Sequence, residues 1–269
     1  MKKILVTGGD GRFASILKKN KTKFQFIYLD KKQLNICNLN SIYKAIKKYK
    51  PDILLHLAGL SRPMSIHEKD IVKSINLNII GTANLVNACS KFKIKIIYFS
   101  TSYIYPGKKG NYKETDPLLP WNNYGWSKLG GESSVQMYKN SLILRCCMTE
   151  RPFVHKKAYA NVKSNFIFHS DLVKIFLRVV NRFGIYNMGG KSKTIYNFAK
   201  KYNPDIKKTF SQGEFPLKQD MNLNKIYFQG KYLSSSTFGQ KRRTAEKFDY
   251  NKQYFIFTNL TPHRGERHK

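Results

Sequence analysis

The fold of this 269-residue chain is decided by one stretch near its start, Thr7-Gly8-Gly9-Asp10-Gly11-Arg12-Phe13-Ala14. A short apolar run (4–6) precedes it and a helix-like pattern follows it, so the glycines occupy a turn between a strand and a helix. Gly9, Gly11 and Ala14 fit the dinucleotide fingerprint G-x-G-x-x-G/A, and Asp30 closes the next apolar run about 20 residues on. Glycine lets the backbone turn tightly and approach a pyrophosphate, whose charge the helix N-terminus stabilises. The stretch therefore predicts a dinucleotide site in which Asp30 accepts hydrogen bonds from an adenosine ribose.

Strand-like and helix-like patterns alternate through the first 145 residues. Apolar runs predict strands at 3–7, 24–29, 52–57, 94–99 and 141–145. Helical patterns lie between them, near 12–20, 40–50, 69–91 and 123–140. Strands that are apolar on both faces and alternate with helices are typical of parallel sheets covered on both sides. The fold class predicted is therefore α/β, a doubly wound, Rossmann-like parallel sheet.

The pattern loosens after Arg145, where a reduced C-terminal substrate region is expected. A helix is predicted over 170–182, a strand over 185–187 and another helix over 194–202. We expect residues 1–203 to form an NAD(P)-binding domain, with short substrate-binding insertions at about 146–169. The periodicity fades beyond residue 204, so 204–269 are expected to form an irregular, partly disordered basic tail.

The formal net charge of +33 raises the hypothesis of nucleic-acid binding. Lysine outnumbers arginine 39 to 10, however, and the lysines are spread along the whole chain at polar positions of the predicted helices. No nucleic-acid recognition motif accompanies the charge. The pattern favours a solvated lysine surface, which makes a nucleic-acid partner the less favoured reading.

The composition also bears on the cellular location of the protein and on its ligands. The four cysteines form no C-x-x-C pair, and the histidines lack metal-site spacing, so no metal site is expected. No apolar run is long enough to span a membrane, and the first residues do not resemble a secretory signal. These features predict a cytoplasmic protein with reduced thiols and no membrane partner.

Reactive side chains are expected at two further places, the end of the fourth strand and the start of the following helix. The strand ends in Ser100-Thr101-Ser102-Tyr103, and the helix opens with Tyr124 and Lys128. The spacing Tyr-x-x-x-Lys alone means little, since it occurs seven times in this chain. Only the copy at Tyr124 follows a glycine fingerprint, a fourth strand ending in Ser-Thr, and a proline-containing loop.

Residues four apart on a helix lie on the same face, so Tyr124 and Lys128 can meet one ligand. A free phenol has a pKa of about 10, which makes it a poor acid or base at neutral pH. We expect the ammonium of Lys128 to lower the pKa of Tyr124 toward the working range. Thr101 would hold the substrate oxygen in line. The trio predicts proton transfer next to a nicotinamide that transfers a hydride.

With these residues in place, the chain resembles the extended short-chain dehydrogenase/reductase superfamily, and within it the dTDP-4-dehydrorhamnose reductase-like sugar-nucleotide reductases. The resemblance covers roughly residues 1–203. It rests on the segments Thr7-Gly8-Gly9-Asp10-Gly11, His56-Leu57-Ala58-Gly59, Asn78-Ile79-Ile80-Gly81-Thr82, Ser100-Thr101-Ser102-Tyr103-Ile104-Tyr105, Tyr112 to Pro120, Tyr124-Gly125-Trp126-Ser127-Lys128-Leu129-Gly130-Gly131-Glu132 and Gly184-Ile185-Tyr186-Asn187-Met188-Gly189-Gly190.

The resemblance implies a role for each matching residue. Thr101 would bind the substrate oxygen, Tyr124 would exchange its proton, and Lys128 would hold the nicotinamide ribose. The expected catalytic residues are thus Thr101, Tyr124 and Lys128. The residues expected to contact or support the cofactor are Gly8, Gly11, Arg12, Phe13, Ala14, Asp30, Ala58, Gly59, Asn78, Tyr124 and Lys128.

Two features bear on the substrate. Dehydratases of this superfamily carry an Asp-Glu pair where this chain has Ser102 and Tyr103, which favours reduction or epimerisation. Ser102, Tyr103 and Arg151 are expected to contact the substrate. Arg151, with Lys156 and Lys157 in a short basic lid, could meet a diphosphate; a solvated loop is the alternative.

The sequence favours an NAD(P)-dependent reductase or epimerase acting on a 4-keto-6-deoxyhexose nucleotide. A homodimer is the assembly considered for it. A non-catalytic dinucleotide-binding or regulatory subunit is the alternative from another class. The choice between NAD and NADP stays open. Arg12, Lys31 and Lys32 could reach a 2′-phosphate, whereas Asp30 disfavours one.

Overall fold

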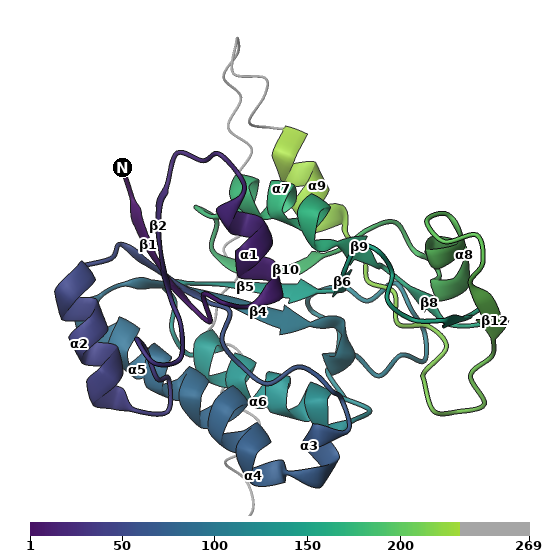
Figure 1. Cartoon of the computed structure of the whole chain (residues 1–269), viewed down its shortest axis with the longest axis horizontal. Coiled ribbons are helices and arrows are strands. Elements are labelled where there is room, and N and C mark those ends of the chain that lie inside the picture. Colours follow the sequence, from purple (N-terminus) through teal and green to yellow (C-terminus); the bar gives the residue numbers. More distant parts are fainter. Residues whose placement is uncertain (232–269) are drawn as a thin grey trace, which may run out of the picture. The chain divides into compact units, whose positions relative to one another are not determined.

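The computed structural model describes residues 1–231, and its centre is a sheet of six parallel strands (Figure 1). From edge to edge the order is β2-β1-β3-β4-β5-β10, with every neighbouring pair parallel. The strands are β1 (Lys3–Thr7), β2 (Gln25–Leu29), β3 (Ile53–His56), β4 (Lys95–Thr101), β5 (Ser141–Cys146) and β10 (Gly184–Met188). The strand order reverses between β1 and β3, and ligands of doubly wound sheets bind at such a reversal.

Helices cover both faces of the sheet, so the predicted doubly wound α/β class is confirmed. One face is covered by α1 (Arg12–Lys18), α7 (His169–Val179) and α9 (Asn224–Lys231). The other is covered by α2 (Leu39–Tyr49), α5 (Gly81–Phe92) and α6 (Asn123–Gln136). Each layer has its own apolar core, one around Phe13, Phe99 and Phe176, the other around Leu5 and Leu54.

The helix predicted over 69–91 is largely confirmed, because the chain is continuously helical through α4 (Ile71–Ser74), a π-helix (Ile75–Ile80) and α5. A separate short helix, α3 (Ile66–Lys69), precedes it. The carboxylate of Asp70 accepts a hydrogen bond from the Lys73 amide at 2.8 Å and so starts α4 afresh. At the end of the π-helix, a Cβ on Gly81 would lie 2.7 Å from Ile36. Helix α5 therefore packs close to the segment after β2, a contact that periodicity does not reveal.

Short strand pairs replace an extended substrate region. The strands are β6 (Met148–Thr149), β7 (Lys157–Tyr159), β8 (Lys163–Ser164), β9 (Ile167–Phe168), β11 (Lys193–Thr194) and β12 (Lys207–Thr209), with α8 (Ile195–Lys200) beside them. They pair as β6-β9, β7-β12 and β8-β11. Lys157, expected in a lid, thus begins a strand.

The structure differs from the domain boundary expected at residue 203. One compact unit runs from Met1 to Lys231. Residues 204–231 contribute β12 and α9, and Met221 bridges to Tyr112. The segment lacks periodicity because it is mostly extended chain held by isolated backbone contacts. The expectations for 232–269 lie outside the described residues.

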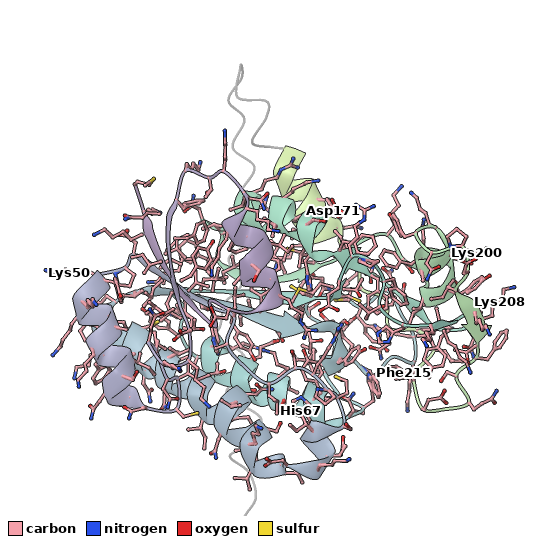
Figure 2. The ribbon with its side chains drawn as sticks, in the orientation of Figure 1. Lys50, His67, Asp171, Lys200, Lys208 and Phe215 are labelled. Atoms are coloured by element: carbon pink, nitrogen blue, oxygen red, sulfur yellow. The ribbon has the colours of Figure 1, made fainter. Side chains whose placement is uncertain are left out.

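Most lysines lie on the outside of this unit, and Lys95 is an exception because it is buried. Figure 2 labels Lys50, Lys200 and Lys208, which come from different elements and are all exposed. This placement supports the solvated-surface reading of the charge.

Candidate active site

The glycine turn after β1 is packed against the end of β3. Gly8 has a φ of +66°, and a Cβ there would lie 2.8 Å from Ala58 Cα. Gly59 has a φ of +148°, and a Cβ there would lie 2.9 Å from Asn78 Oδ1. Only glycine suits both positions, because a side chain would be strained and would collide with the neighbouring residue. The turn therefore occupies the point at which the strand order reverses, and Gly8 and Ala58 lie together there.

Asp30 follows the end of β2 at the same edge of the sheet. Its carboxylate accepts a hydrogen bond from the Gln33 amide at 2.8 Å, while the Gln33 side chain accepts one from the Asp30 amide at 3.1 Å. These two hydrogen bonds hold the Asp30 carboxylate at the end of β2, the strand next to β1 and its glycine turn. A tight glycine turn with this acid on the next strand fits a dinucleotide.

Asn78 lies in the π-helix and is buried. Its amide nitrogen donates to Leu60 O at 2.9 Å and to Ser127 Oγ at 2.8 Å, and its Oδ1 accepts from the Leu60 amide at 2.7 Å. It thus connects the loop after β3 to helix α6. Helix irregularities of this kind are frequent at functional sites.

Thr101 and Tyr124 meet at the carboxyl edge of the sheet. Thr101 is the last residue of β4, and Tyr124 is the second residue of α6, which Asn122 caps by accepting from the Gly125 amide at 2.8 Å. Burial raises the pKa of Tyr124 to about 12, although the hydrogen bond with Thr101 and the charge of Arg62 act to lower it. The phenol therefore keeps its proton at neutral pH.

The expectation that Lys128 lowers the pKa of Tyr124 is wrong. The Nζ of Lys128 lies 4.1 Å from the centre of the Tyr98 ring, and Lys128 is not among the groups that shift the phenol. Burial lowers the pKa of Lys128 itself to about 7, with the carboxylate of Glu132 opposing that shift. The side chain is thus close to half charged at neutral pH.

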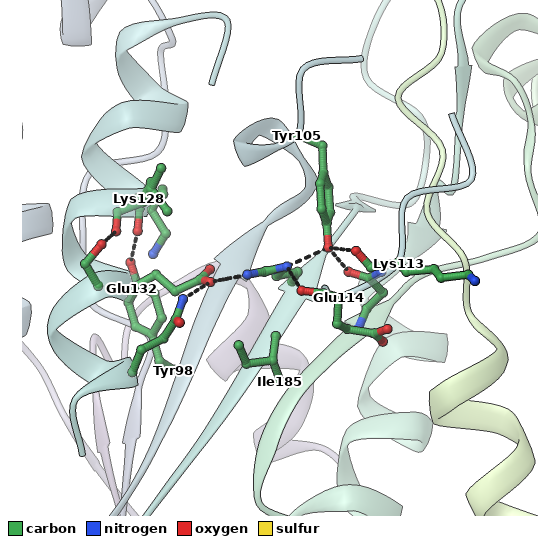
Figure 3. A network of polar contacts seen from close by, with 12 residues as sticks. Tyr98, Tyr105, Lys113, Glu114, Lys128, Glu132 and Ile185 are labelled. Carbon is green, nitrogen blue, oxygen red and sulfur yellow. Dashed lines mark hydrogen bonds and ion pairs between the residues drawn. The ribbon is translucent and has the colours of Figure 1, made fainter. Parts of the chain in front are cut away.

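Glu132 belongs to the buried polar network in Figure 3. Arg145 Nη2 lies 2.7 Å from Glu132 Oε1, and these two side chains are 2% and 0% exposed. Arg145 Nη1 also donates to Tyr105 Oη at 2.7 Å and to the Glu114 carbonyl at 2.9 Å. The network joins α6, which carries Lys128, to β5 and to the loop after β4.

Of the three residues expected to contact substrate, two follow Thr101 directly and the third packs on other aromatic rings. Ser102 and Tyr103 form a 3-10 helix directly after Thr101, and the Tyr103 ring lies edge-on to Tyr124 with centroids 5.7 Å apart. Arg151 instead stacks on the Phe168 ring, at 5.0 Å, and lies 5.3 Å from the Tyr202 ring. The guanidinium whose charge acts on Tyr124 belongs to Arg62.

Sequence reasoning missed Arg62, Glu150 and His67. Glu150 makes ion pairs with Arg12 and Arg62. The buried His67 ring lies 5.1 Å from the Tyr124 ring, and its Nδ1 is 2.7 Å from Ser74 Oγ. Burial lowers the pKa of His67. The available signal was position, since Arg62 lies in the loop after β3 and Glu150 follows β6, both near the edge that carries Thr101.

Two features are absent from residues 1–231. No helix among them is long and apolar enough to cross a membrane. No group of three or more His, Cys, Asp or Glu side chains among them could hold a metal ion.

The chain is similar to known proteins in both sequence and fold. Over 154 residues the chain is 29% identical to a dTDP-4-dehydrorhamnose reductase from Aggregatibacter actinomycetemcomitans, covering 55% of this chain and 52% of that protein. Over 103 residues it is 30% identical to methionine adenosyltransferase 2 subunit beta from Pongo abelii, covering 38% and 30%. The chain thus spans about half or less of the curated relatives it matches.

A solved structure of dTDP-4-dehydrorhamnose reductase from Bacillus anthracis, in complex with NADP, superposes with a TM-score of 0.77. The two chains are 20% identical, with 85% of this chain and 92% of the other covered, so this likeness concerns the fold. Residues 1–158 match the family described as RmlD substrate binding domain. Since that match covers more than half of the sequence, the chain belongs to the RmlD substrate binding domain family.

Proposed function

We propose that this protein is an NAD(P)-dependent reductase of a 4-keto-6-deoxyhexose nucleotide. The observation that carries the proposal is the placement of Thr101 and Tyr124 at the carboxyl edge of the sheet, where Thr101 ends β4 and Tyr124 lies in the first turn of α6 beside it. The same edge holds the glycine turn and Asp30, which fit a dinucleotide. The similarity to a named dTDP-4-dehydrorhamnose reductase supports this substrate class.

Tyr124 is suited to act as the acid in such a reduction. Because its pKa is raised to about 12, the phenol is protonated at neutral pH and has a proton to donate. Thr101 would hold the keto oxygen, and Tyr124 would transfer its proton to that oxygen as the carbonyl becomes a hydroxyl. A bound reduced nicotinamide would supply the hydride.

Lys128 would serve the same site through charge and hydrogen bonding. Its donors would hold the nicotinamide ribose. Since its pKa is lowered to about 7, that charge is sensitive to pH in the neutral range.

Reduction fits the site better than dehydration, because positions 102 and 103 carry serine and tyrosine in place of an acid pair. The Tyr103 ring packs against Trp121 at 5.1 Å and against Tyr124. An aromatic ring therefore lies beside the phenol where an acid would be needed for dehydration.

The test is oxidation of NADH or NADPH when a panel of 4-keto-6-deoxyhexose nucleotides is added. Tyr124→Phe should lower turnover by at least a hundredfold, the loss typical of a removed general acid. Tyr43→Phe is the matched control, since Tyr43 begins another Tyr-x-x-x-Lys copy, on α2. Full activity of Tyr124→Phe would reject the assignment. Dinucleotide binding without turnover on any of these substrates would favour the non-catalytic subunit.

A homodimer is part of the proposal. Ile71 and Trp126 are 54% and 49% exposed, although both are apolar. They line a groove of about 490 Å³, formed by α3, α4, the π-helix and α6. Light scattering of the native protein and of Ile71→Glu tests this proposal. A monomeric native protein would reject it.

A further inference from the structure

Three charged side chains from three separate loops meet at the carboxyl edge of the sheet. Arg12 follows the glycine turn after β1, Arg62 lies in the loop after β3, and Glu150 follows β6. Arg12 Nη1 is 2.6 Å from Glu150 Oε1, and Arg62 Nη1 is 3.0 Å from Glu150 Oε2. Each carboxylate oxygen therefore pairs with one guanidinium.

The arrangement has the chemistry of an anion site that already holds an anion. Guanidinium groups match phosphate and carboxylate geometry alike. The arginine side chains are 47% and 37% exposed, whereas Glu150 is 22% exposed, so ligands can approach the arginines from solvent. Burial alone would raise the pKa of Glu150, but Arg12 and Arg62 outweigh burial and hold the pKa below its ordinary value. The carboxylate therefore stays charged between the two guanidiniums at neutral pH.

Arg12 and Arg62 also lie between the glycine turn, where the coenzyme is expected, and Tyr124, where the sugar is expected. Arg12 directly follows Gly11 of the glycine turn. Arg62 lies close enough to Tyr124 for its charge to lower the pKa of that phenol. An anion bound to both arginines would thus lie between the glycine turn and the reacting phenol.

We infer that Arg12 and Arg62 form a binding site for a diphosphate, and that Glu150 is a built-in competing anion which the diphosphate must displace. The inference rests on the proposed function, which requires a diphosphate-containing ligand at this edge. Two ligands share that chemistry, the dinucleotide coenzyme and the nucleoside diphosphate sugar.

The direct test is calorimetric titration of the full-length chain with NADH alone and with dTDP-glucose alone. Glu150→Gln keeps the shape of the side chain and removes its charge. We expect the variant to bind one of the two ligands about threefold to tenfold more tightly than the native chain does, the range set by loss of two partly exposed ion pairs. The ligand whose affinity increases identifies the source of the diphosphate.

The matched control is Asp52→Asn, which removes one negative charge at the opposite edge of the sheet. Asp52 precedes β3, and its carboxylate accepts a hydrogen bond from the Lys3 amide at 2.8 Å. This control should leave both affinities within twofold of native, which separates local competition from the overall positive charge. An equal gain in Asp52→Asn would overturn the inference.

Arginine variants complete the design. In the Glu150→Gln background, Arg12→Gln and Arg62→Gln should each reverse the gain for the same ligand. The inference is refuted if Glu150→Gln binds both ligands no more tightly than native, or if neither arginine change reverses the gain. These assays measure binding alone. A chain that shows the expected affinities but turns over no sugar nucleotide would reject the proposed function and leave the inference intact.

Discussion

Activity should fall as the pH rises above neutral, because Lys128 loses its proton there. Its pKa is lowered from 10.5 to about 7 by burial. The charged fraction is then about one half at pH 7, about one tenth at pH 8 and about one hundredth at pH 9. If the ammonium is needed to hold the ribose, kcat/KM should fall by about the same factors. The sign follows directly: the charge is present below the folded-state pKa and is lost above it.

The assay is kcat/KM for reduced coenzyme oxidation from pH 6 to 9 at constant ionic strength, with circular dichroism at each pH. Lys128→Arg is the matched control, because a guanidinium stays charged across this range and can stack on the Tyr98 ring. Its activity should be lower but nearly independent of pH above 7. A native profile that stays flat from pH 7 to 9, or an equal fall in Lys128→Arg, would refute the reasoning.

Three further outcomes are expected. Lys95→Met should reduce the free energy of unfolding in urea by about 1–3 kcal/mol, because Lys95 is buried and donates to two main-chain carbonyls, at 2.8 and 2.6 Å; an unchanged midpoint would contradict this. Arg145→Met should cost about 3–5 kcal/mol by leaving the buried Glu132 carboxylate unpaired, and adding Glu132→Gln should restore part of that loss. A double variant no more stable than Arg145→Met would contradict the pairing. Asp30→Asn should raise the NADPH-to-NADH ratio of kcat/KM, because it removes repulsion of a 2′-phosphate; an unchanged ratio would remove Asp30 from the ribose site.

The sheet could be predicted because its signals are local. The glycine turn, the apolar runs and the helical patterns each occupy one continuous stretch of sequence, and parallel strands buried on both faces read as continuous apolar runs. The π-helix within the helix predicted over 69–91 could not be predicted from local patterns, and neither could the close packing of Gly81 against Ile36, which is remote in sequence. The ordered structure of residues 204–231 could not be predicted for a similar reason, because it depends on contacts such as that of Met221 with Tyr112.

In the candidate site, too, some features follow from local sequence patterns and others depend on contacts between remote residues. The positions of Thr101 and Tyr124 follow from a strand end and a helix start, which the sequence marks clearly. The direction of the Lys128 side chain could not be predicted from the sequence, because its packing on Tyr98 determines it. The Arg12–Glu150 pair joins residues 138 positions apart, so only the folded chain brings them together.

The central claim is that Tyr124 donates a proton at a site where a dinucleotide is bound. Stopped-flow single-turnover measurement of reduced nicotinamide absorbance tests it most directly, with native chain and Tyr124→Phe each loaded with NADH or NADPH before the keto sugar nucleotide is added. The account predicts that coenzyme binds both proteins with similar affinity, while the variant oxidises it at least a hundredfold more slowly. Equal oxidation rates in the two proteins would contradict the account.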